Sequence, residues 1–203
     1  MISQYDAEAG NQVACHLVDL STQRRTGLRG QAAQSVLAAQ SLPFPPQPNQ
    51  LLVAQQGQLV ARLGRSECWV LDDPLNPVLE TEVLDQASDA SPDCYPLYCQ
   101  HSHAWFALIS DDSVDNSESS DVLAELMAKL CAVDFRLPVF PPGSIAQTSV
   151  ARVNAIVIRH SLNQAPAFFI LSDRSSADYL WHTLTDAMQE FNSSVISELS
   201  KLN

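Results

Sequence analysis

Basic residues are scarce in this chain of 203 amino acids, which has 11 lysines and arginines and 23 aspartates and glutamates. The resulting net charge of −12 argues against binding to nucleic acid or to an anionic membrane, because both need a basic surface. The sequence also has no run of lysines and arginines that would supply such a surface locally. An acidic chain of this kind is suited to solubility or to docking onto a basic partner.

Long apolar segments and a cysteine framework are missing as well. No apolar run approaches the roughly 20 residues that span a bilayer, and residues 1–20 lack the basic flank and apolar core of a signal peptide. The cysteines are odd in number and scattered, which indicates reduced thiols rather than disulfides. We therefore expect a cytoplasmic protein with no membrane segment. The cysteines are Cys15, Cys68, Cys94, Cys99 and Cys131.

Signatures of nucleophilic and nucleotide chemistry are absent too. No G-x-S-x-G pattern occurs, and none of the six glycines belongs to a G-x-G-x-x-G phosphate loop. Ser144 and Cys131 have no base whose proximity the sequence establishes. His160 and His182 stand singly, which is more typical of packed or exposed histidines than of general bases. We predict no catalytic residue and no cofactor. The tryptophans are interpreted as core or interface residues, at Trp69, Trp105 and Trp181.

One segment has side chains suited to a metal ion, Cys94-x4-Cys99-x-His101-x-His103. Thiolates and imidazoles are the ligands that zinc prefers. A structural zinc site, however, usually pairs a tight C-x2-C with a second pair of ligands, and the spacing here is wider. The two histidines also alternate into an expected strand. We therefore predict that the segment binds no metal.

The residues that are present, 46% hydrophobic and 17% charged, are those of a globular protein. Residues 1–23 are expected to form an extended lead-in. A short strand at 26–30 precedes a helical stretch within 31–42, which the prolines at 43–48 end. Three short β-like runs with turn signals between them follow at 51–56, 58–64 and 68–73.

The same order of elements recurs in the second half. An aromatic-rich strand at 104–110 precedes a helix within 122–130, and a proline loop at 138–142 follows. Strands are expected near 146–152, 153–160 and 167–172. The chain ends in an amphipathic helix within 174–191, for which Ser175-x-x-Asp178 is a candidate capping box.

This recurrence indicates an internal duplication. We interpret residues 1–203 as a single domain of the α+β class, built from duplicated β-α-β-β units with mostly antiparallel sheet. The two pseudo-repeats are expected at about 24–72 and 103–192, and residues 73–102 are expected to join them as a linker.

Motifs within residues 131–191 carry a family resemblance. The segment that begins at Cys131 reads CAVDFRLPVFPPGSIAQTSVARVNAIVIR, and AFFILSDRSSADYLWHTLTDAMQEF follows it. Three motifs, C-x-V-D-F, F-P-P-G-x-x-A-Q-T and R-S-x-A-D-Y-L-W, resemble the gamma subunit of heterotetrameric sarcosine oxidase and related N-methyl amino acid oxidoreductases. In the first half, GLRG, LPFPPQPNQ and ARLGRSECWVL resemble the same family less strongly.

The resemblance implies the fold of the folate-binding domains of the glycine-cleavage T-protein. In this family the alpha and beta subunits carry the flavins, the nicotinamide cofactor and the folate, whereas the gamma subunit has no established catalytic role. The expected partners are therefore flavoprotein alpha and beta subunits, with no cofactor on this chain. The proline loop is expected to hold a rigid corner that offers apolar contacts to a partner. The interface residues would be Leu137, Val139, Phe140, Pro141 and Pro142.

Two other functions stay open at this point. The chain is also compatible with a stand-alone, tetrahydrofolate-binding protein of the aminomethyltransferase kind, or with an unrelated structural binding module. A pterin pocket needs a carboxylate or amide placed inside an apolar cleft. The strands expected to be buried, LLVAQQ, AWFALIS and NAIVIR, contain no acid, which favours a protein partner over folate.

Overall fold

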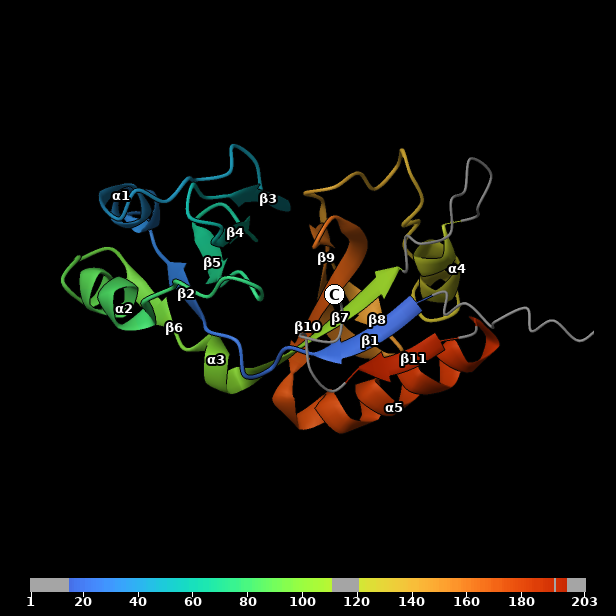
Figure 1. Cartoon of the computed structure of the whole chain (residues 1–203). Coiled ribbons are helices and arrows are strands. Elements are labelled where there is room, and N and C mark those ends of the chain that lie inside the picture. The colour runs from blue at the N-terminus through green and yellow to red at the C-terminus, as the bar shows by residue number, and fades with distance from the viewer. Residues whose placement is uncertain (1–14, 111–120, 192, 197–203) are drawn as a thin grey trace, which may run out of the picture.

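Two β-sheets form the centre of the molecule, and helices lie on their outer faces (Figure 1). The computed structural model describes residues 15–110, 121–191 and 193–196. The fold class is the expected one, α+β with mainly antiparallel sheets. No helix in the described ranges is long and apolar enough to cross a membrane.

Among the described residues, the first sheet has six strands in the order β11-β1-β7-β10-β9-β8. Neighbouring strands pair antiparallel, except for the parallel pair of β1 and β11. The central strand β7 is buried on both faces, which explains its continuous apolar sequence AWFALI. The strands are β1 Cys15–Asp19, β7 His103–Ser110, β8 Ile145–Val150, β9 Val153–Leu162, β10 Ala165–Asp173 and β11 Ser193–Ile196.

In the part of the chain that the structure describes, the second sheet has five strands in the order β3-β4-β5-β2-β6, and its neighbouring strands all pair antiparallel. The β4–β5 hairpin turns at Gly64-Arg65-Ser66, as the turn signal in the sequence predicts. Its strands are β2 Arg25–Arg29, β3 Gln50–Val53, β4 Leu59–Arg62, β5 Glu67–Leu71 and β6 Tyr95–Leu97.

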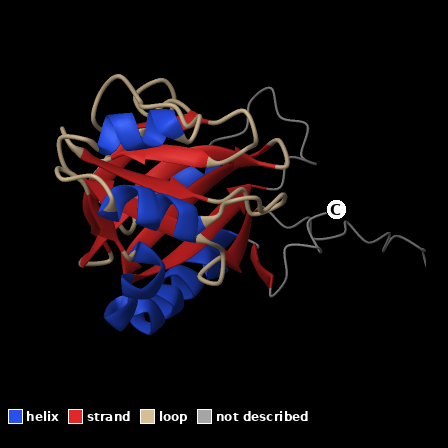
Figure 2. Ribbon diagram, turned by 90° about the vertical axis from the view of Figure 1, so that its left-hand side faces the viewer, coloured by secondary structure: helices blue, strands red, loops and turns tan. Residues whose placement is uncertain are grey.

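The helices complete a four-layer arrangement, with α1 and α2 to the left of the sheets in Figure 1 and α4 and α5 to the right and below. Figure 2 shows the same helices and strands after a 90° turn, from the left-hand side of Figure 1. Helices α1 and α2 pack on the outer face of the five-stranded sheet, and α4 and α5 pack on the outer face of the six-stranded sheet. The inner faces of the two sheets share a third apolar cluster that includes Trp69, Trp105 and Phe169. The helices are α1 Ala33–Ala39, α2 Thr81–Asp89, α3 Cys99–Ser102, α4 Val122–Ala128 and α5 Ala177–Met188, with 3-10 turns η1 Arg174–Ser176 and η2 Gln189–Phe191.

Alternation along the strands determines which core each side chain joins. In β7, Phe106 and Leu108 face the helices, whereas Trp105 and Ile109 face the other sheet. Each fully buried leucine or phenylalanine contributes about 1.5–3 kcal/mol relative to an exposed position. A sheet that is apolar on both faces therefore needs a layer on each side, and the helices and the second sheet supply these layers.

The two sheets share a strand order that bears on the proposed duplication. Four strands of the second sheet lie in the order β3-β4-β5-β2, and four of the first lie in the order β8-β9-β10-β7. In each set the first strand along the chain, β2 or β7, is followed by a helix and then by three antiparallel strands. This correspondence supports two pseudo-repeats, which stay a proposal.

Three local expectations differ from the structure. Residues 15–19, expected within an extended lead-in, form β1 inside the six-stranded sheet because they pair with both β7 and β11. The expected linker at 73–102 contains α2, β6 and α3 and completes the second sheet. The predicted capping box is wrong, because the Asp173 carboxylate accepts hydrogen bonds from the Ser175 N–H at 2.8 Å and the Ser175 hydroxyl at 2.6 Å.

Candidate functional site

The proline loop joins the two sheets at one edge. The Leu51 N–H of β3 donates to the Gly143 carbonyl at 2.8 Å, and the Ile145 N–H of β8 donates to the Asn49 carbonyl at 3.0 Å. Gly143 has φ of +84°, a left-handed conformation that favours glycine. The Gly143 N–H in turn donates to the Arg159 carbonyl at 2.8 Å. The loop is therefore held by backbone contacts from β3 and β9.

Of the five expected interface residues, four are exposed and one is buried. Leu137 and Val139 are 56% and 65% exposed, and Pro141 and Pro142 are also on the surface. Phe140, at 7% exposure, is buried, so the expectation that it contacts a partner is corrected. The interface proposal keeps the other four residues.

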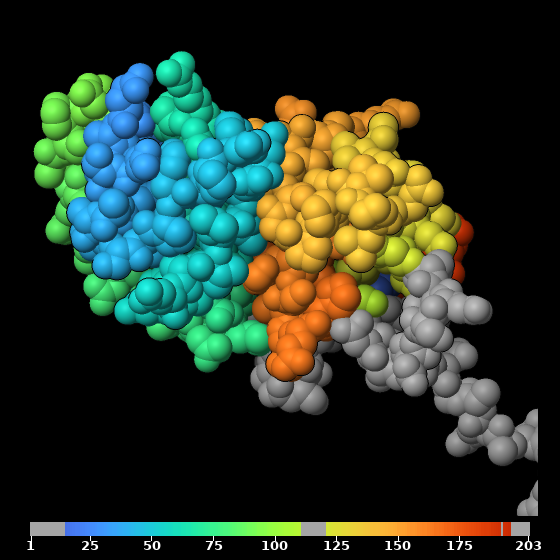
Figure 3. Space-filling model, turned by 90° about the horizontal axis from the view of Figure 1, so that it is seen from above, coloured from blue at the N-terminus to red at the C-terminus, as the bar shows by residue number. Residues whose placement is uncertain are grey.

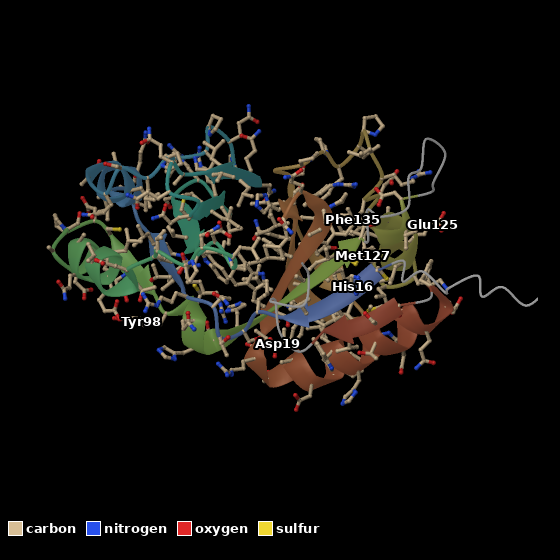
Figure 4. All side chains as sticks on the ribbon, viewed as in Figure 1. His16, Asp19, Tyr98, Glu125, Met127 and Phe135 are labelled. Atoms are coloured by element: carbon tan, nitrogen blue, oxygen red, sulfur yellow. The ribbon has the colours of Figure 1, made fainter. Side chains whose placement is uncertain are left out.

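An aromatic cluster explains where Phe140 lies. Its ring meets Phe135 at 4.9 Å between centroids and Phe168 at 6.3 Å. Phe135 and Met127, both labelled in Figure 4, belong to the same apolar cluster between α4 and the sheet. The Arg159 guanidinium lies 5.1 Å from the centroid of Phe168 and donates to the Phe135 carbonyl at 2.6 Å. The loop is thus anchored by Phe140 and exposes its other apolar side chains.

Arg25 is a buried charge that the sequence did not indicate. It is the first residue of β2 and is 1% exposed. The polar segment QRRTGLRG around it would instead suggest a residue on the surface. Its guanidinium donates to the carbonyls of Ser21, at 3.2 Å, and Gln23, at 2.7 Å. It also donates to the carbonyls of Gln100 and His103. Arg25 therefore connects the second sheet with α3 and with the start of β7.

A cavity of about 340 Å³ opens at one end of the six-stranded sheet. Register places Leu171, Ile156 and Gln147 side by side on β10, β9 and β8. The Gln147 amide donates to Asn49 Oδ1 at 2.8 Å and to the Leu63 carbonyl at 2.6 Å. This side chain therefore links the cavity end of the first sheet to residues that flank β3 and β4 of the second sheet. The lining offers amides, a hydroxyl and an imidazole for hydrogen bonding. Its residues are His103, Gln147, Thr148, Asn154, Ala155, Ile156 and Leu171.

His103 is the titratable residue of this lining. Burial lowers its pKa below the ordinary 6.5, whereas the carboxylate of Asp173 acts in the opposite direction. The imidazole packs edge-on against Trp69 at 4.7 Å, and its Nδ1 lies 2.8 Å from the Ser102 hydroxyl. Burial also lowers the pKa of His160 on β9, with Asp73 opposing the shift. Both imidazoles are therefore held in the neutral form near pH 7.

We expect the chain to lose thermal stability as the pH falls below about 6.5, the usual imidazole value. The folded pKa values of His103 and His160 lie below the unfolded value, so the unfolded chain binds more protons in that window. Stability is full above the unfolded pKa and declines until the pH reaches the folded values. Melting curves between about pH 7.5 and 5.5 measure this decline. A double His103→Gln, His160→Gln variant should show a shallower decline than the original chain. Equal slopes in the two chains would contradict the assignment.

The Cys94–His103 segment does not bring its side chains together. Cys94 is buried under α1 and α2, where its sulfur accepts a hydrogen bond from the Ser88 hydroxyl at 3.2 Å. Cys99 lies in the apolar cluster between the two sheets, and His101 is exposed. Among the described residues, no group of three or more His, Cys, Asp and Glu side chains is arranged to hold a metal ion. The prediction that the segment binds no metal stays a prediction.

We expect the native chain to be unreactive toward thiol reagents. All five cysteines are buried and free, and burial raises the pKa of Cys15 to about 11 and of Cys68 and Cys99 to about 12. Because the thiolate is the reactive form, a disulfide reagent at about pH 8 should titrate almost none of them. The same reagent should titrate all five after denaturation. Rapid titration of a native thiol would contradict this account.

Ser144, Cys131 and His182 were also considered for chemistry, and each lies in surroundings that indicate a structural role. The Ser144 carbonyl accepts from the Arg159 N–H at 3.0 Å, and Ser144 bridges to Gln50 of β3. The Cys131 sulfur lies 3.6 Å from the Thr148 hydroxyl. His182 is exposed on α5. The tryptophans are packed as predicted, with Trp69 and Trp105 between the sheets and Trp181 5.1 Å from Phe106.

Solved structures match this arrangement of sheets and helices. A chain of heterotetrameric sarcosine oxidase from Corynebacterium sp. U-96, determined in complex with pyrrole 2-carboxylate, matches with a TM-score of 0.70 and 20% identity over 92% of both chains. The glycine cleavage system aminomethyltransferase T from Bartonella henselae matches with a TM-score of 0.58 and 12% identity. That match covers 90% of this chain and 51% of the other. This is a T-protein-like fold.

The fold expected from the motifs is thereby confirmed. This chain spans about half the length of the aminomethyltransferase but nearly the whole of the oxidase chain. No protein-family model matches the sequence, and no curated protein matches it.

Proposed function

We propose that this chain is a non-catalytic, structural subunit of a sarcosine oxidase-like enzyme that oxidises an N-methyl amino acid in one-carbon metabolism. The observation that carries the proposal is the whole-length likeness to a chain of heterotetrameric sarcosine oxidase, at 92% coverage in both directions. The likeness to the aminomethyltransferase extends over only 51% of that enzyme. Motifs at 131–191 that resemble the gamma subunit of the same oxidase support the proposal independently.

The partners in this proposal are the flavoprotein alpha and beta subunits of the enzyme. The relative is heterotetrameric, so it functions in an assembly of different chains. The exposed part of the proline loop, from Leu137 to Pro142, offers apolar contacts whose conformation is already fixed. Little conformational entropy is lost when such a loop is buried, which favours its use in assembly.

The test is to produce the flavoprotein subunits of the same organism with and without this chain. A structural subunit should raise the yield and the melting temperature of the assembled enzyme and leave the turnover per assembled flavin almost unchanged. The isolated chain should be colourless and should not oxidise sarcosine. The alternative, a stand-alone aminomethyltransferase-like protein, would be favoured if the isolated chain bound tetrahydrofolate at micromolar concentration and the flavoprotein subunits assembled equally well without it.

A further inference from the structure

The charged residues of this chain are distributed very unevenly. Residues 30–61 contain no Asp, Glu, Lys, Arg or His, and neither do residues 137–151. Elsewhere the chain is strongly acidic, with a net charge of −12 over its whole length. Seven acids lie within residues 72–93 alone, around α2. Two long neutral segments in such a chain need a physical reason.

The fold places these two segments against each other. Gln50 of β3 pairs with Ser144 as an isolated antiparallel bridge, next to the hydrogen bond from the Leu51 N–H to the Gly143 carbonyl. The Gln147 side chain adds a further bond to Asn49. Figure 3 shows from above that the cyan surface around residues 45–56 adjoins the gold surface around residues 135–145. The two segments thus form one neutral face that crosses the junction of the two sheets.

Apolar side chains and prolines are exposed on this neutral face. Leu52 and Val53 of β3 are 38% and 55% exposed, and Leu137 and Val139 are 56% and 65% exposed. Strand β3 is also the edge strand of its sheet, and among the described residues the proline loop bonds to this edge only at Asn49 and Leu51, ahead of Leu52 and Val53. Edge strands are commonly protected by charged side chains, and β3 has none. The exposed prolines, which stiffen the face, are Pro46, Pro48, Pro138, Pro141 and Pro142.

We infer that this neutral face, residues 46–56 together with 137–142, is the surface on which a flavoprotein subunit of the enzyme docks. The inference rests on the proposed function and names the surface and the chemistry of its partner. Depletion of charge with exposed apolar residues at the centre is typical of a protein interface. The partner surface must be apolar and uncharged at its centre, because the centre of this face has no charged side chain to pair with a buried charge.

Charge also favours a different subunit over a second copy of this chain. A second copy would bring another net charge of −12 toward the same face. Like-charged molecules repel each other as they approach, whereas a subunit with little net charge or a positive net charge does not meet this repulsion. Nucleic acid fits poorly, because the face itself has no lysine or arginine, and the two arginines at its margin, Arg62 and Arg136, bond to the Pro46 carbonyl and the Asp134 carboxylate.

The test introduces a charge at the face and, separately, at matched apolar positions elsewhere. Leu52→Glu and Val139→Glu alter the face, and Val83→Glu on α2 and Tyr179→Glu on α5 are controls with similar exposure. Each variant is produced with the flavoprotein subunits, and the amount of this chain that co-purifies is measured, with the melting temperature of the isolated chain as a check of folding. The face variants should reduce co-purification by about tenfold or more, as expected for central interface positions, and the controls should not.

The outcomes are distinguishable. If the unaltered chain assembles and the face variants assemble equally well, this inference is wrong and the proposed function stands. If the unaltered chain does not assemble with the flavoprotein subunits, the proposed function fails and the inference fails with it. If the isolated chain is a dimer that Leu52→Glu and Val139→Glu dissociate, a second copy occupies the face and the inference is overturned.

Discussion

Replacing Phe140 by alanine is expected to lower the free energy of unfolding by about 3–5 kcal/mol, the usual range for a buried phenylalanine. The ring is 7% exposed and packs against Phe135 at 4.9 Å. Its removal leaves a cavity under the proline loop, because the backbone bonds of Gly143 restrain the loop from collapsing. Urea unfolding followed by circular dichroism measures the loss.

Val139→Ala is the matched control for this variant. Val139 is the preceding residue in the same loop, but it is 65% exposed, so its truncation should change stability by less than about 0.5 kcal/mol. Phe140→Leu retains part of the apolar volume and should fall between the two. A Phe140→Ala chain with an unchanged urea midpoint would show that the ring does not anchor the loop. It would also restore the original expectation that Phe140 faces a partner.

Arg25→Ala should lower the free energy of unfolding by about 3 kcal/mol or more. The variant removes the shared donor of four backbone carbonyls, those of Ser21, Gln23, Gln100 and His103. These acceptors lie where β2, α3 and β7 meet. Each buried acceptor that is left without a donor costs about 1–3 kcal/mol, although water that enters the vacated space reduces the sum.

Two further variants separate the charge of Arg25 from its geometry. Arg25→Lys keeps the charge but cannot reach carbonyls in several directions, so it should recover only part of the lost stability. Arg65→Ala, at an exposed arginine in the β4–β5 turn, should be almost neutral. Thermal unfolding of the original chain and the three variants measures the order of their stabilities. Equal melting temperatures for the original chain and Arg25→Ala would contradict the assigned network.

The central strands β7 and β10 and the helix α4 can be predicted from the sequence because the patterns that indicate them are local. The apolar segments AWFALIS and AFFILS predict β7 and β10, and the spacing of Leu123, Leu126 and Met127 predicts α4. The motifs around the proline loop also led to the right fold, which the solved structures confirm. In the strongly apolar segments, the elements predicted from local patterns fit the fold that the family resemblance implies.

The elements that the sequence missed depend on distant partners. Residues 15–19 are a strand because β7 and β11 supply hydrogen bonds on both sides, and no local pattern reports this. Strands β8 and β9 match the strands expected near 146–152 and 153–160, but no local signal marks the turn between them at Ala151-Arg152, where both φ values are positive although neither residue is glycine. From its place in the proline loop, Phe140 is expected to offer a preorganised apolar contact to a partner. Its burial follows from Phe135 and Phe168, which only the tertiary structure brings near.

The neutral face could not be predicted from the sequence either. Each charge-free segment is visible in the sequence, but only the bridge between Gln50 and Ser144 shows that the two form one surface. Arg25 shows the opposite case, since a charged residue in a polar segment gives no sign that it is buried. Sequence patterns therefore indicate the layers of this fold well and the contacts between the layers poorly.

The subunit assignment is tested most directly by native mass spectrometry of this chain produced together with the flavoprotein subunits of the same organism's oxidase. The account predicts a single flavin-containing assembly that includes one copy of this chain and remains intact through dilution. A complete, active flavoprotein assembly without this chain, with the chain itself recovered only as a free species, would contradict it.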